Sequence, residues 1–283
     1  MQQLDDESTT DPFADMKRQH QEFLRRIEHV KVTDILGVVG AMGAGGSLGK
    51  TEDDCTLVFH FAGWRQEGEA LQTTELRVEM PVSREALSLH MARIKPYDIL
   101  RVKGQVADHP VGRKQALVQE IISYDVRDDD LEAMAEKLQK PVVVDDPRFG
   151  VFTLNRSVKW FCGDSLWAGT CIKLNLSMGG ADSIEEPLAV AAQLWDSEEE
   201  WNIKIVDFAV KDLLPVKNEA WLDEDEAELD ADQFEKRMTL ESITVYPDGA
   251  FEFWYDDGDM FLGHVIMIAG SLAGGLDRAD ICG

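Results

Sequence analysis

Four side chains near the end of the sequence have the chemistry of a metal site or an acid–base site: Asp256, Asp257, Asp259 and His264. Carboxylates beside an imidazole can bind a divalent cation or exchange protons with a substrate. Their spacing matches no calcium loop and no zinc motif, however, and Asp and Gly are also the ordinary residues of tight turns. The other five histidines lie apart. We therefore expect a structural turn here, with no catalytic residue, no metal and no cofactor.

A glycine-rich run, residues 44–51, satisfies a relaxed phosphate-loop pattern. The true motif needs a strand before it and a helix after it, because the N–H groups at a helix start bind the phosphate. Glu52, Asp53 and Asp54 follow instead, and they lead into a strand-like run from Cys55. We predict a flexible loop between two strands and no nucleotide site.

The densest charge lies in residues 223–232, where seven of ten residues are acidic. Such a run is either a solvated helix face or loop, or a surface that replaces a nucleic acid in a basic cleft. Trp221, two residues before the run, would add an aromatic contact. The candidate partner-binding residues are Trp221, Asp223, Glu224, Asp225, Glu226, Glu228 and Asp230.

The charge of the whole chain is distributed unevenly. The chain has 54 acidic and 28 basic residues, a formal net charge of −26. Residues 128–283 hold 34 acidic and 12 basic residues, whereas residues 31–127 hold 13 and 12. A field of this sign repels nucleic acid and anionic lipid and speeds the encounter with a basic protein. The alternative is that the charge serves solubility alone.

Other features of the composition indicate a cytoplasmic protein. The sequence has no run of ~18 apolar residues, the length needed to span a membrane. The acidic start of the chain is unlike a secretory signal. The four cysteines have no C-x-x-C spacing. Cys162 and Cys171 could meet across a hairpin, but free thiols are the expected state in the cytosol.

The elements that must position these residues form an α+β protein of two domains. After a helical extension, residues 1–30, the segment 31–127 contains three strand-like runs, a helix that Ser83 would cap, and two further strands. This order is that of an OB-like β-barrel. The run Asp128-Asp129-Asp130 would cap a helix in the segment 128–145, which ends as a linker.

Residues 146–283 are predicted to be an acidic α+β domain, in which helices cover an antiparallel sheet. Strands are expected at 151–154, 158–162 and 167–176, and a helix at 184–195. Ser197 would open a second helix with a capping box, and Pro215 would end it. A three-stranded meander is expected at 242–246, 250–255 and 264–268, since Asp248-Gly249 is a strong hairpin signal.

OB barrels often bind single strands or oligosaccharides through a basic groove and stacking aromatics. The candidates are Phe59, Phe61, Trp64, Arg65, Arg77, Arg101 and Lys103. The alternative, which we favour, is that the aromatics fill the barrel, because a near-neutral barrel joined to an anionic domain binds nucleic acid poorly.

The end of the chain resembles an uncharacterised family of small bacterial α+β proteins. The resemblance is carried by Trp254 to Ile266, where an acidic turn precedes a Gly-His pair, and by the closing run Ala279 to Gly283. Asp146 to Gly150 is similar to the start of that domain. The signature residues are Asp256, Asp257, Gly258, Asp259, Gly263 and His264. Related families occur among the immunity genes of bacterial polymorphic-toxin systems, so the resemblance implies an intracellular protein that binds a toxin.

Three hypotheses follow. The leading one is an immunity protein that occupies the active site of a cognate toxin in the cytoplasm. The toxin domain would be basic, and a nuclease and an ADP-ribosyltransferase fit equally well. The second is an OB-type protein that binds nucleic acid or oligosaccharide. The third is an enzyme that uses the Asp256–His264 cluster.

Overall fold

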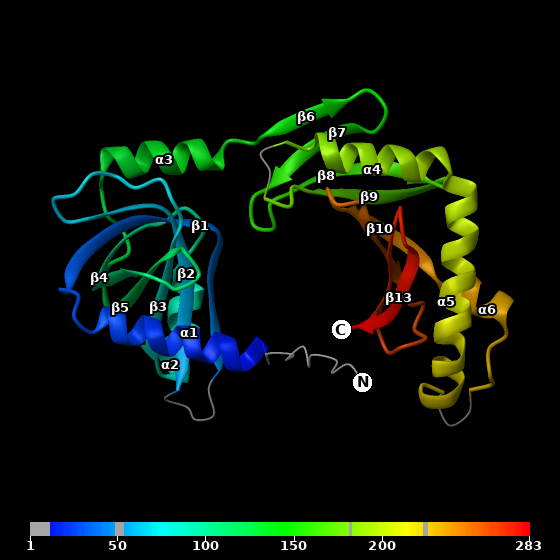
Figure 1. Ribbon diagram of the computed structural model, residues 1–283, viewed down its shortest axis with the longest axis horizontal. Helices are drawn as coiled ribbons and strands as arrows, with labels where there is room; N and C mark the ends of the chain where they lie inside the picture. The colour runs from blue at the N-terminus through cyan, green and yellow to red at the C-terminus, as the bar shows by residue number, and fades with distance from the viewer. Residues whose placement is uncertain (1–11, 49–53, 181–182, 223–225) are drawn as a thin grey trace, which may run out of the picture. The chain divides into compact units, whose positions relative to one another are not determined.

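The computed structural model describes residues 12–48, 54–180, 183–222 and 226–283. The chain divides into two units, residues 1–140 and residues 141–283, and each is described by itself (Figure 1). Unit 1 is a closed barrel, and unit 2 is a sheet with helices. The prediction of an α+β protein that begins with an OB-like barrel is confirmed.

Five strands form the barrel of unit 1, in the order β1-β2-β3-β5-β4. β1 pairs with both β2 and β4 and so closes the barrel, and β3 runs parallel to β5. This is the topology of the OB fold. The strands are β1 (Thr33–Leu48), β2 (Cys55–Gln66), β3 (Leu76–Val82), β4 (Ile99–Asp108) and β5 (Lys114–Ser123).

Three helices accompany the barrel: α1 (Pro12–Ile27), α2 (Arg84–Arg93) and α3 (Asp129–Gln139). The two predicted caps are confirmed, since Ser83 accepts a hydrogen bond from the Ala86 N–H and Asp128 accepts one from the Leu131 N–H. A capping side chain satisfies an N–H group that the helix leaves without an internal partner. α1 is held through the buried Phe23 and Ile27.

Aromatic side chains fill the barrel interior. Phe59, Phe61 and Trp64 have at most 2% of their surface exposed, and the rings of Phe59 and Phe61 meet edge to face at 5.3 Å. The Trp64 Nε1 donates a hydrogen bond to the Thr74 carbonyl. These three rings therefore cannot stack on a bound strand, and the alternative that they form the core is correct.

The glycine-rich run differs from its prediction as a loop. β1 continues through Leu48, and Gly45 and Gly46 pair with Val58 and Leu57 of β2. A side chain at Gly46 would come within 2.5 Å of the Leu87 side chain, so a strand can pass here only as glycine. Residues 49–53 lie outside the described residues. β2 begins at Cys55, so the strand-to-helix geometry of a phosphate loop is not formed.

Unit 2 contains one eight-stranded sheet, in the order β13-β12-β11-β10-β9-β8-β7-β6. Its first strands are β6 (Val143–Asp146), β7 (Gly150–Asn155), β8 (Trp160–Trp167) and β9 (Thr170–Ser177). The others are β10 (Thr239–Val245), β11 (Ala250–Asp256), β12 (Val265–Ser271) and β13 (Gly275–Cys282). The helices between β9 and β10 are α4 (Glu185–Asp196), α5 (Glu198–Ala220) and α6 (Ala231–Arg237).

The sheet differs from its prediction in three respects. The meander at its end has a fourth strand, β13, and the segment predicted as a connector contains β6. The sheet is also not wholly antiparallel, because β9 and β10 run parallel. A parallel pair needs a long crossover connection, and α4, α5 and α6 form it.

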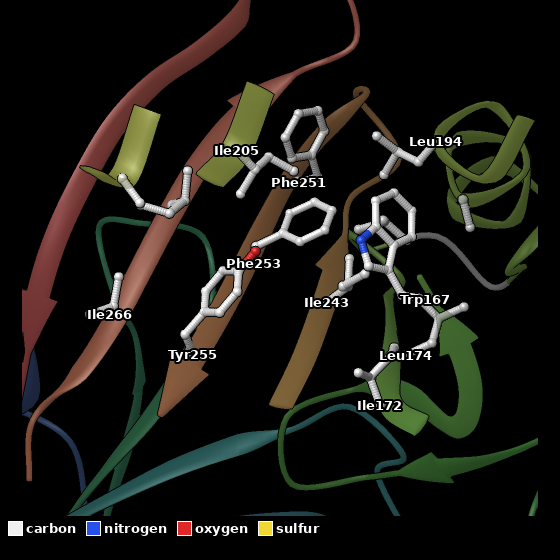
Figure 2. Close-up of a cluster of buried hydrophobic side chains, with 14 of the residues drawn as sticks. Trp167, Ile172, Leu174, Leu194, Ile205, Ile243, Phe251, Phe253, Tyr255 and Ile266 are labelled. Carbon is white, nitrogen blue, oxygen red and sulfur yellow. The ribbon is translucent and has the colours of Figure 1, made fainter. Parts of the chain in front are cut away.

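The core of unit 2 lies between one face of the sheet and these helices, which Figure 1 shows together on one side of it. Trp167, Ile243 and Phe253 of the sheet meet Leu194 of α4 and Ile205 of α5 in the close-up of Figure 2. The rings of Trp167 and Phe253 pack edge to face at 5.1 Å. Alternate strand residues thus supply a continuous apolar layer.

α5 departs from its prediction at both ends. The Ser197 side chain makes no capping hydrogen bond, and Glu198 instead accepts one from the Ala168 N–H of the β8–β9 turn. The helix also continues past Pro215 to Ala220. A proline removes one backbone hydrogen bond, so contacts elsewhere must hold the last turn of α5.

Replacing Gly37 by Ala should destabilise the barrel. A Cβ at Gly37 would lie 2.4 Å from the Phe61 ring, so the ring must move within a packed interior. We expect the free energy of unfolding to fall by about 1–3 kcal/mol. Urea denaturation, followed through hydrogen exchange of the barrel amides, measures it. Gly45→Ala is the matched control, because a Cβ there meets nothing within 4 Å. Equal stability of the two variants would contradict this packing.

Candidate partner-binding site

The structure brings together the two clusters that the sequence places about 30 residues apart. Trp221, at the end of α5, packs edge-on against the rings of Phe261 and His264, with centroids 5.6 Å and 5.3 Å away. Phe234 of α6 also contacts Phe261, at 6.3 Å. We call residues 217–237 together with residues 256–264 the acidic corner.

Lys217 lies at the centre of the acidic corner, with only 1% of its side chain exposed. Its Nζ donates hydrogen bonds to Glu226 Oε2 at 2.5 Å and to the Trp221 carbonyl at 2.7 Å. The other carboxylate oxygen of Glu226 accepts from Arg237 at 3.3 Å. A buried ammonium group is tolerated only when such partners replace its water, so this network determines where residue 226 lies.

Asn218, the next residue of α5, fastens the far end of the same connection. Its Nδ2 donates to the Leu229 carbonyl and its Oδ1 accepts from the Leu229 N–H, both at 2.9 Å. Asp230 then caps α6 by accepting from the Gln233 N–H, and the Gln233 side chain accepts from the Asp230 N–H in return. The connection is therefore attached at residues 221, 226, 229 and 230.

The predicted partner-binding residues occupy different positions in this corner. Trp221 is half-buried, Glu226 takes part in the ion pairs, and Asp230 is exposed but caps α6. Glu228 is exposed. The remaining three lie outside the described residues: Asp223, Glu224 and Asp225.

The acidic turn of the signature is held by its own carboxylates. Asp257 is 2% exposed and accepts hydrogen bonds from the N–H groups of Asp259 and Phe261, at 3.1 Å and 2.6 Å. Asp256 accepts from the Gly258 N–H. Gly258 has a φ of 54°, and a Cβ there would lie 2.5 Å from the Arg237 carbonyl. Glycine is thus required for the turn to pack against the end of α6.

His264 belongs to the same turn. Its Nδ1 lies 2.7 Å from the Phe261 carbonyl, and its ring packs on Trp221. Within the described ranges, no three His, Cys, Asp or Glu side chains are grouped so that they could hold a metal ion. The contacts of His264 and Asp257 are those of residues that stabilise a turn.

Sequence analysis missed Lys217 and Asn218. A signal for Lys217 is present, because Ala209, Leu213 and Lys217 follow one another at intervals of four on the buried face of α5. A lysine that continues an apolar stripe predicts a buried ion pair. Asn218 has no comparable signal, since its partner is a backbone group brought near by the fold.

Two of the four basic candidates of the barrel form ion pairs with acidic side chains. Arg65 forms ion pairs with Asp128 and Asp130, whose hydrogen bonds raise its pKa above the ordinary value. Arg77 pairs with Glu79 at 2.7 Å. The last two are exposed on β4: Arg101 and Lys103.

Charge is concentrated in unit 2. Residues 141–283 contain 29 acidic and 10 basic residues, a formal net charge of −19. All four cysteines are free, so Cys162 and Cys171 do not form a disulfide. Among the helices of the described residues, none has the length and apolar character needed to cross a membrane.

In comparisons with known proteins, each unit is similar to a family of unknown function. Residues 146–281 match DUF2262, an uncharacterized protein conserved in bacteria, and residues 19–138 match DUF7021, a domain of unknown function. A search of curated proteins found no match. The resemblance of the end of the chain to an uncharacterised bacterial family is confirmed, and neither description mentions immunity.

Solved structures similar to this chain include two single-stranded DNA-binding proteins. One is the mitochondrial protein Rim1 of S. cerevisiae, with 8% identity and a TM-score of 0.23, covering 34% of this chain and 98% of its own. The other, from Streptomyces coelicolor, has 13% identity and a TM-score of 0.22, and covers 34% and 92%. Likeness at these values says nothing about what this chain binds.

Replacing Lys217 by Met should loosen the acidic corner. The change removes both hydrogen bonds of Nζ and leaves Glu226 with Arg237 as its partner. We expect unit 2 to lose about 2 kcal/mol of unfolding free energy. Urea denaturation measures the loss, and hydrogen exchange at residues 221–230 should quicken. Lys211→Met, on the same helix with a side chain 78% exposed, is the control and should be neutral. A Lys217 variant as stable as that control would contradict the network.

Proposed function

We propose that this protein is an immunity protein, which binds a basic toxin domain in the cytoplasm and blocks the active site of the toxin. The proposal is supported by one combination of features. Unit 2 has a formal net charge of −19, and its densest run of carboxylates lies in a connection whose ends are fastened by buried contacts.

Fastening matters for affinity because the loss of conformational freedom that accompanies binding opposes it. A free acidic tail would lose that freedom on binding, whereas Glu226, Leu229 and Asp230 are already held by hydrogen bonds within the folded unit. Glu228 is exposed within this stretch and can meet a cation of the partner. These hydrogen bonds thus reduce the conformational entropy that is lost when the carboxylates bind a basic surface.

The overall charge would act before contact. A strongly anionic unit attracts a cationic partner over about a Debye length, roughly 8 Å at physiological ionic strength, and so speeds encounter. Apolar contacts would make dissociation of the complex slow. Among the predicted residues, the half-buried Trp221 could form such a contact through the exposed part of its side chain.

The proposal involves binding without catalysis and without nucleic acid. Asp257 and His264 use their polar atoms on backbone groups of their own turn. Phe59, Phe61 and Trp64 fill the barrel interior, so unit 1 does not use these rings as a stacking surface for bases. The chemistry of the toxin is open, and a nuclease and an ADP-ribosyltransferase fit equally.

Neutralising the acidic run should weaken the complex. Four changes remove its charge without touching Glu226: Asp223→Asn, Glu224→Gln, Asp225→Asn and Glu228→Gln. The product of the adjacent upstream gene serves as the trial partner. We expect the Kd to rise about tenfold or more in calorimetry, mainly through slower association in stopped-flow measurements. Added salt should weaken the native complex more than the variant complex.

The control removes the same charge from exposed positions of unit 1: Glu120→Gln, Asp125→Asn, Asp129→Asn and Glu136→Gln. It should change the association rate much less. If both sets of changes act equally, the site is not at the acidic corner. Absence of any complex with the native chain would remove the proposed function.

A further inference from the structure

β13 is an edge strand. It pairs with β12 on one side, and within the described residues no strand pairs with its other side. The strand has eight residues, Gly275–Cys282. An edge of this length presents backbone N–H and C=O groups that another strand can bind.

An apolar groove lies beside this edge, between β13 and α5. Its volume is about 420 Å³, and its apolar lining includes Trp201 and Phe208 of α5 and Leu276 of β13. Trp201 is fixed from behind, because its ring packs on that of Phe251 at 5.1 Å. The layer between the helices and the sheet is therefore open to solvent where the sheet ends, and a ninth strand would close it.

We infer that a second copy of this chain supplies that strand, so that two β13 strands pair antiparallel about a two-fold axis at Ala279. In this register, Arg278 of each copy lies opposite Asp280 of the other. Both residues are on the helix-free face, opposite Ala269 and Met267 of β12. Opposite charges directly across an antiparallel pair stabilise it, and the two-fold axis forms the pair twice.

The other face of β13 agrees with this register. Ala279 and Ile281 face the helices, since they lie opposite Ile268 and Ile266 of β12. A small side chain at the axis allows the two strands to approach. Ile281 of the second copy would lie opposite Asp277, one residue from Leu276 at the edge of the groove. A register shift between Ala269 and Gly270 bends β13 before Arg278, so the matched pairs are the central ones.

A second copy fits better than an unrelated strand because β13 carries both members of the charge pair. Within one chain, Arg278 and Asp280 already approach to 3.4 Å on the surface, so each can exchange its partner for the same residue of the other copy. The net charge of −26 opposes association of two copies. Salt screens this repulsion beyond roughly 8 Å at 0.15 M, while contacts across the strands persist. A reversible dimer is the expected state.

Sedimentation velocity of the full chain at 0.15 M salt tests the inference without any toxin. The native protein should shift with concentration from 31.7 kDa toward twice that mass. Arg278→Asp and Asp280→Arg should each weaken the dimer about tenfold or more, because like charges then face each other twice. The double variant carries the reversed pair and should restore the dimer. Circular dichroism verifies that each variant is folded.

Lys173→Asp is the matched control. Lys173 forms a similar exposed ion pair with Asp164, but on β9, inside the sheet, so the variant should dimerise like the native chain. A native protein that stays monomeric at the highest concentration would overturn the inference. So would a dimer unaffected by Arg278→Asp. The outcome does not depend on whether the toxin binds.

Discussion

The buried ion pair of Lys217 and Glu226 organises the acidic half of this protein. An ammonium group with 1% exposure would be unstable without partners, so the carboxylate and the Trp221 carbonyl must lie where they do. The same requirement explains why α5 continues past Pro215. The turn after the proline contains Lys217 and Asn218, whose hydrogen bonds to residues 221, 226 and 229 hold it in place. One internal contact therefore determines both the end of a helix and the start of the acidic connection.

This contact also links the two regions that carry the proposed function. Trp221, whose carbonyl accepts from Lys217, packs on Phe261 and His264 of the signature turn. The turn in turn contacts the Arg237 backbone through Gly258. Buried carboxylates of the acidic corner, such as Asp257, accept hydrogen bonds that stabilise the corner. Those at its surface, such as Glu228, are exposed to solvent. A strongly anionic unit can in this way be stable and still present charge at its surface. Some of its carboxylates have hydrogen-bond partners inside the unit, and others are exposed.

Sequence patterns predicted the features that depend on neighbouring residues. The barrel order, the caps at Ser83 and Asp128, and the Asp248-Gly249 hairpin follow from local periodicity and turn chemistry. The features that failed depend on tertiary contacts. β13 has no alternating pattern of its own and forms because β12 offers it an edge. The Ser197 capping box did not form, and Glu198 instead accepts a hydrogen bond from the Ala168 N–H of a distant turn. The contact between Trp221 and His264 could not be predicted, because only the fold brings the two residues together. The burial of Lys217 could have been predicted, because this lysine continues the apolar stripe of α5.

Hydrogen–deuterium exchange of the full chain, with and without the product of the adjacent upstream gene, tests the central claim most directly. The account predicts that binding slows exchange in residues 221–230 and in the adjoining start of α6, and leaves the strands of the barrel unchanged. Protection confined to the barrel, or protection of unit 2 that spares this connection, would contradict it.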